Sequence, residues 1–142
     1  GVLMEKGIEY SKIIDDTFYT KTYDQNRILG KALLDSKLYL DGKCIATYLT
    51  RETMQEFSCA PKHLDGIVNQ LRVTKGVVVA AFLYENEDGS YKVSLRANGD
   101  FNVADVVAVF GGGGHVKAAG CTMDGGIESI LERLMAEIAK RL

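Results

Sequence analysis

The sequence has no long apolar run. Its longest uninterrupted apolar stretch extends from Val77 to Tyr84, far short of the roughly 18 residues that suggest a membrane-spanning helix. The N-terminus also lacks the basic and then apolar residues of a secretion leader. With 46% hydrophobic and 25% charged residues among 142, the composition is typical of one soluble globular domain. We therefore expect a cytoplasmic protein.

Cysteine is scarce, and neither sign of charge is in large excess. The three cysteines, at positions 44, 59 and 121, form no Cys-x-x-Cys pair, so the sequence indicates neither a zinc site nor redox chemistry. We expect reduced and mostly buried thiols. A formal net charge of -2 argues against a protein that coats nucleic acid through a general positive field. Any polyanion must therefore be bound by local contacts.

Histidine is scarcer still, with only His63 and His115. Neither lies in an Asp-His-His segment or another spacing typical of metal ligands, although phosphodiester hydrolysis generally uses a metal-activated water. Asp15 and Asp16 are adjacent, but neighbours on a helix diverge by about 100°, so we assign both to a solvated surface. A Cys59–His63 dyad is disfavoured because a turn separates the two and no oxyanion loop is evident. The sequence predicts no metal ligand and no catalytic residue in this chain.

Hydrophobic spacing predicts helices and β-hairpins along the whole chain. The Asp41-Gly42 pair and the Glu87-Asp88-Gly89 turn each separate two apolar runs, which indicates two hairpins. Thr50 and Asn102 can cap helices through their side-chain oxygens. The expected helices cover 8–18, 24–35, 51–57, 62–71, 102–110 and 127–138, and the expected strands cover 38–40, 44–49, 77–85, 91–97 and 121–123. The predicted fold class is α/β, with a mixed β-sheet built on two hairpins and backed by helices.

Glycine is abundant, and four glycines are consecutive at 111–114, directly before His115. Glycines let successive backbone N–H groups converge on an anion, and the histidine ring adds a side-chain donor. The spacing does not match Gly-x-Gly-x-x-Gly, and no Gly-Lys-Ser or Gly-Lys-Thr occurs, which excludes a Rossmann turn and a P-loop. From the glycines alone, a flexible connection after a helix is as good an interpretation as a phosphate-binding loop.

A wider set of residues follows the pattern of a known family. Lys92-Val93-Ser94-Leu95-Arg96, then Val103 after a short spacer, then Gly-Gly-Gly-Gly-His-x-x-Ala-Ala-Gly over 111–120, resembles the C-terminal domain that accompanies DHH-type phosphoesterases. The branch that it resembles most is that of the bifunctional oligoribonucleases and phosphoadenosine-phosphate phosphatases. The resemblance extends upstream through 65–69 and 76–80 and covers nearly the whole chain.

The resemblance implies a substrate-binding site. In that family a strand arginine and a Gly-Gly-Gly-His loop bind substrate phosphates, opposite a separate domain that carries manganese on Asp and His. Ala97 stands where many relatives carry a second serine, which removes one hydroxyl from the expected site. The residue chemistry agrees, because the planar guanidinium of Arg96 suits two phosphate oxygens. The implied phosphate contacts are Arg96, Ser94, Gly112, Gly113, Gly114 and His115.

The resemblance also implies that the chain is part of a larger enzyme. Residues 1–36 are expected to form a helical connector from a missing catalytic domain, and residues 37–142 the DHH-associated substrate-binding domain. We expect this part to bind a short single-stranded oligonucleotide or a nucleotide phosphate, to hold no cofactor, to bind no membrane and to be inactive alone, with manganese in the catalytic domain.

Two alternatives stay open at this point. One is a stand-alone module that binds nucleic-acid ends without cleaving them, and the other is the same domain of a cyclic-dinucleotide phosphodiesterase. The sequence does not distinguish RNA from DNA and does not fix the oligomeric state. It also leaves open which of four aromatic residues stacks on a base, because all of them fit the core as well: Phe101, Phe110, Tyr84 and Tyr91.

Overall fold

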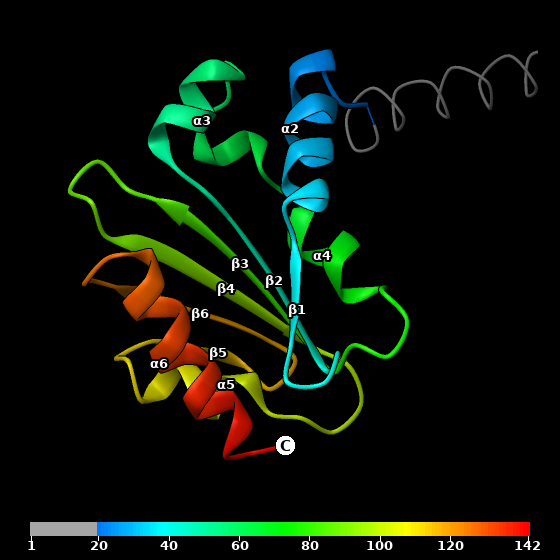
Figure 1. Cartoon of the computed structure of the whole chain (residues 1–142), viewed down its shortest axis with the longest axis vertical. Coiled ribbons are helices and arrows are strands. Elements are labelled where there is room, and N and C mark those ends of the chain that lie inside the picture. Colours follow the sequence, from blue (N-terminus) through cyan, green and yellow to red (C-terminus); the bar gives the residue numbers. More distant parts are fainter. Residues whose placement is uncertain (1–19) are drawn as a thin grey trace, which may run out of the picture.

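A computed structural model describes residues 20–142 (Figure 1), so the predicted helix over 8–18 and the Asp15-Asp16 pair lie outside the described residues. The described part is built on a six-stranded sheet of order β1-β2-β3-β4-β6-β5. Every neighbouring pair is antiparallel except β2 and β3, which are parallel. The predicted fold class, α/β with a mixed sheet, is confirmed. The strands are β1 (Lys37–Tyr39), β2 (Cys44–Leu49), β3 (Val79–Glu85), β4 (Tyr91–Ala97), β5 (Gly113–His115) and β6 (Ala118–Met123).

Side-chain caps and tight turns set several element boundaries as the sequence predicts. Thr50 accepts the backbone N–H of Thr53 and begins α3, and Asn102 accepts the N–H of Asp105 and begins α5. Both caps satisfy an amide that has no partner within its helix. The first hairpin turns at residues 40–43, where Leu40, Asp41 and Gly42 all have positive φ, and glycine adopts that conformation without strain. The helices are α2 (Tyr23–Leu34), α3 (Arg51–Glu56), α4 (Ile67–Arg72), α5 (Val103–Ala108) and α6 (Ile127–Ala139).

The continuous helix predicted over 62–71 is wrong in its first half. A single 3-10 turn covers Pro61–His63, and α4 begins only at Ile67. Gly66 lies between them with a φ of 94°, a left-handed conformation that cannot continue a right-handed helix. The apolar spacing of this segment is helical, but the glycine interrupts it.

Helices cover the two faces of the sheet unequally. One core joins α5 and α6 to side chains from β2, β3, β4 and β6. The other core lies beneath α2, α3 and α4, and its strand residues come from β2 and β3 alone. Figure 1 shows the two groups of helices on opposite sides of the sheet. On the side of α2, α3 and α4, therefore, β4, β6 and β5 contribute no residue to the buried core, although α4 contacts β4. We call this area the open half-face; its side chains are those of Lys92, Ser94, Arg96, His115, Ala118 and Thr122.

Helix α2 packs directly on the sheet, although it falls within the stretch 1–36 assigned above to a connector. Ile28 and Ala32 are fully buried in the core beneath α2, and burial of an isoleucine side chain contributes roughly 1.5–3 kcal/mol. The Thr47 hydroxyl of β2 donates to the Ala32 carbonyl at 2.7 Å. Among residues 20–142, no helix combines the length and the apolar character that a membrane crossing requires.

Candidate functional site

The strand register brings Arg96 and His115 to the same place on the open half-face. Arg96 of β4 pairs with Ala118 of β6, and Ala118 pairs in turn with His115 of β5. Directly paired residues project from the same face of a sheet, and two strand spacings place the Arg96 and His115 Cα atoms about 10 Å apart. Arg96 is half-buried and His115 is exposed. The two side chains can therefore contact one ligand from opposite sides.

Ser94 belongs to the next row on the same face. It lies two residues before Arg96 on β4, and it pairs with Gly120, which pairs with Gly113. The other two residues of this row are glycines, so Ser94 supplies its only side chain. The surface of the sheet beside the Arg96 row is therefore nearly flat. Arg96 donates from one guanidinium nitrogen to the Leu95 carbonyl at 3.0 Å. Because a guanidinium has five N–H donors, other donors are left for an anion.

Backbone hydrogen bonds at the β5–β6 turn hold this alignment. The Val103 N–H, at the start of α5, donates to the Val116 carbonyl at 2.8 Å. The Ala97 N–H, at the end of β4, donates to the Lys117 carbonyl at 3.0 Å. The turn that follows His115 is thus attached both to a helix and to the neighbouring strand. The position of His115 relative to Arg96 is set by the fold.

The glycine segment is not the free loop that the sequence predicts. Gly113, Gly114 and His115 form β5, an edge strand paired with β6, and β6 begins at Ala118 rather than at 121. A Cβ on Gly112 would lie 2.5 Å from the Cys121 Cβ, and one on Gly114 would lie 2.7 Å from the Ala118 carbonyl oxygen. Packing therefore requires glycine at 112 and 114. Gly113 is exposed with open space at its Cβ position, which leaves that position clear for a ligand.

Alanine substitutions should separate the packing role of these glycines from ligand binding. We expect Gly112→Ala to lower the free energy of unfolding by about 1–3 kcal/mol, because its Cβ overlaps β6 and overpacking costs that much. Gly113→Ala is the matched control and should change it by no more than about 0.5 kcal/mol. Urea denaturation of both variants measures the difference. Equal destabilisation would contradict the packing of β5 against β6.

The cysteines are free and buried, as the sequence predicts. Burial raises the pKa of the Cys44 thiol to about 12 and also raises the pKa of the Cys59 and Cys121 thiols, so the reactive thiolate is disfavoured. The Nδ1 atom of His63 accepts the Ala60 N–H at 2.9 Å. That bond gives His63 a structural role and leaves the Cys59–His63 dyad without support. Within residues 20–142, no group of three or more His, Cys, Asp or Glu side chains is placed to hold a metal ion.

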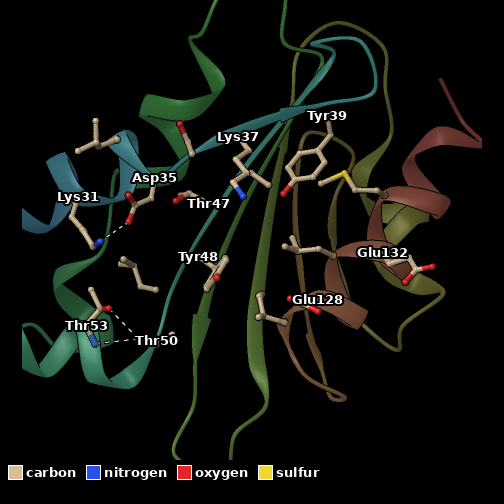
Figure 2. Close-up of a pocket in the computed structure, with 17 residues that line it drawn as sticks. Lys31, Asp35, Lys37, Tyr39, Thr47, Tyr48, Thr50, Thr53, Glu128 and Glu132 are labelled. Atoms are coloured by element: carbon tan, nitrogen blue, oxygen red, sulfur yellow. Dashed lines mark hydrogen bonds and ion pairs between the residues drawn. The ribbon is translucent and has the colours of Figure 1, made fainter.

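A cavity of about 950 Å³, which sequence reasoning missed, lies away from the open half-face. Figure 2 shows Lys31 of α2 on one side and Glu132 of α6 on the other, with Tyr48 of β2 between them. None of the predicted phosphate contacts lines it. The sequence signal is the unequal length of the two strands expected in the first hairpin, because β1 pairs with only half of β2, from Cys44 to Ala46. Near the rim of the cavity, the Lys31 Nζ lies 2.7 Å from the Asp35 Oδ2. The hydrogen bond to Asp35 and its negative charge raise the pKa of the Lys31 ammonium.

Comparison with known proteins assigns the family. Residues 41–142 match the DHHA1 domain. The chain belongs to the DHHA1 domain family. This confirms the resemblance to DHH-type phosphoesterases that the motifs at 92–96 and 111–120 indicate.

Individual relatives agree with the DHHA1 assignment. The chain is 30% identical over 117 residues to the bifunctional oligoribonuclease and PAP phosphatase NrnA of Thermus thermophilus. The aligned region covers 82% of this chain and 34% of the relative. It thus spans about a third of that relative's length. An exopolyphosphatase-related protein from Bacteroides fragilis aligns with a TM-score of 0.86 and 29% identity, over 97% of this chain and 41% of that one. The pGpG-specific phosphodiesterase PggH of Vibrio cholerae shares the fold, with a TM-score of 0.56 and 13% identity over 84% and 40% of the two chains.

Proposed function

We propose that this DHHA1 domain is the part of a DHH-type phosphoesterase that binds the phosphorylated end of a short oligonucleotide or of a nucleoside bisphosphate. The observation that carries the proposal is the row of Arg96, Ala118 and His115 on the open half-face. A guanidinium fork and a ring N–H about 10 Å apart at their Cα atoms suit a tetrahedral anion between them. The Thermus relative is described as an oligoribonuclease and PAP phosphatase, which supports a substrate of this class.

In this proposal the chain binds and orients the substrate, and a separate domain of the same parent protein cleaves it. Arg96 and His115 hold the phosphate, and Ser94 adds a hydroxyl beside them. The open half-face would then be directed towards the catalytic domain, where manganese supplies an activated water and neutralises charge. Fixing the phosphate fixes the scissile bond, and positioning of this kind contributes strongly to rate. Three unpaired buried thiols suit a reducing cytoplasm.

Calorimetry with matched dinucleotides tests the proposal. A dinucleotide that carries a terminal phosphate should bind more tightly than the same dinucleotide without it, because Arg96 and His115 contact that phosphate. Affinity should fall with salt, but with a small slope of about 0.7 per phosphate contacted on a single strand. Equal affinity for the two dinucleotides would refute phosphate-end binding.

A further inference from the structure

A second row of side chains lies on the open half-face, parallel to the Arg96 row. The register pairs Tyr84 of β3 with Lys92 of β4, and Lys92 with Thr122 of β6. Lys92 and Arg96 are four residues apart on one strand, so the two rows share a face and their backbones lie about 14 Å apart. Tyr84 and Lys92 are half-buried, and Thr122 is exposed. The backbone positions that carry an aromatic ring, an ammonium group and a hydroxyl are thus adjacent.

The Lys92 side chain extends over the neighbouring strand, towards the Arg96 row. Its Nζ lies 2.9 Å from the position that a Cβ on Gly120 would occupy. Gly120 pairs with Ser94, whose row is only about 7 Å from that of Arg96 along the strand. Glycine at 120 therefore leaves room for the ammonium group. The Lys92 ammonium consequently lies over Gly120, in the row next to that of Arg96.

Tyr84 differs from the other aromatic residues that could stack on a base. Phe101 and Tyr91 are buried in the core beneath α5 and α6, and Phe110 packs against that same core. Tyr84 packs on the opposite side of the sheet, at the border of the open half-face, with its ring centroid 6.3 Å from that of Phe82. A partly exposed ring beside a cation is the combination that proteins use to bind single-stranded nucleic acid.

We propose that Tyr84, Lys92 and Thr122 form a second nucleotide subsite. The base of the second nucleotide stacks on Tyr84, and the phosphate that links it to the anchored nucleotide contacts the Lys92 ammonium. The inference rests on the proposed function, because the Arg96 row must hold the first phosphate. It adds a length preference, since a mononucleotide cannot reach both rows.

Two acidic side chains at this end of the β3–β4 hairpin have partners. Glu85 accepts the backbone N–H of Arg51 at 3.0 Å. Glu87, in the turn after β3, lies 3.6 Å from the Arg51 guanidinium. Arg51 therefore offsets part of the negative charge at this end of the β3–β4 hairpin, next to the Tyr84–Lys92 pair.

The test compares 5′-phosphorylated diadenylate with AMP by calorimetry. Wild type should prefer the dinucleotide. Tyr84→Leu and Lys92→Met should each weaken dinucleotide binding about tenfold, the scale of one stacked base or one charged contact, with AMP affinity within about twofold of wild type. Lys92→Met should also lower the salt slope by about 0.7. Tyr84→Phe keeps the ring and should bind as wild type. Tyr48→Leu and Lys62→Met are matched controls on exposed residues elsewhere.

The outcomes separate the subsite from the proposed function. If Lys92→Met and Tyr84→Leu bind the dinucleotide as tightly as wild type while Arg96→Ala loses both ligands, the subsite is wrong and phosphate-end binding stands. Equal losses for AMP and the dinucleotide would also overturn the subsite. If wild type does not distinguish phosphorylated from unphosphorylated dinucleotides, both proposals fail. Should Tyr84→Leu not fold, as judged by circular dichroism, Lys92→Met alone decides.

Discussion

Replacing Arg96 by alanine is expected to weaken binding of a phosphate-ended dinucleotide by about 1.5–3 kcal/mol, the range for hydrogen bonds to charged groups. This is roughly a 10- to 150-fold increase in Kd. The Arg96 guanidinium supplies a planar group of hydrogen-bond donors on the open half-face. His115 lies in the same row, because Ala118 pairs with both residues. Calorimetry at one fixed salt concentration measures the loss, because phosphate contacts depend strongly on salt.

Arg96→Lys is the matched control for charge. It keeps one positive charge but loses the planar fork, so its affinity should lie between those of wild type and Arg96→Ala. The unphosphorylated dinucleotide should bind all three proteins alike. Arg96 is half-buried on β4, so circular dichroism of each variant must show an intact fold. A loss that is the same for both dinucleotides would mean that Arg96 does not contact the terminal phosphate.

The other large effect concerns turnover, and it depends on the division of labour proposed above. Purified alone with manganese, this chain should not hydrolyse short oligonucleotides or phosphoadenosine phosphate above background. In the full-length parent, His115→Ala should lower kcat/KM roughly 10- to 100-fold, because a displaced phosphate misplaces the scissile bond. Manganese affinity of the parent should be unchanged, since His115 belongs to the substrate site in this proposal.

Two controls make this result interpretable. Replacement of the exposed Val116, next to His115 in the β5–β6 turn, by alanine should leave turnover near wild type. The isolated chain must be assayed after removal of contaminating nucleases. Sustained hydrolysis by that preparation would show that the division of labour is wrong.

The sequence predicts most elements of this fold where the signal is local. The Asp41-Gly42 turn and the caps at Thr50 and Asn102 each act within a few residues, and all three lie where expected. Edge strand β5 was missed because glycines carry little β-propensity, and its pairing with β6 depends on close packing at Gly112 and Gly114. The break at Gly66 was missed because the apolar spacing around it suits a continuous helix.

The sequence names candidate site residues but not their arrangement in space. The motifs name Arg96 and His115, yet only the order β4-β6-β5 shows that one residue, Ala118, separates them across the sheet. The role proposed for Tyr84 likewise needs knowledge of which core each aromatic side chain joins. Sequence alternation gives the two faces of one strand, but it does not say which face helices leave uncovered.

The single parallel pair in the sheet also bears on how the chain folds. Strands β3 and β4 are joined by a short turn, and so are β5 and β6, whereas β2 reaches β3 only after α3 and α4 have crossed over. The Val78 and Val79 amides then bond to the Lys43 carbonyl, across more than thirty residues. Because the entropy of closing such a loop is lost before its contacts form, we expect residues 79–139 to assemble first. The parallel pairing of β2 with β3 would form last, and α2 would pack on the sheet at the same step.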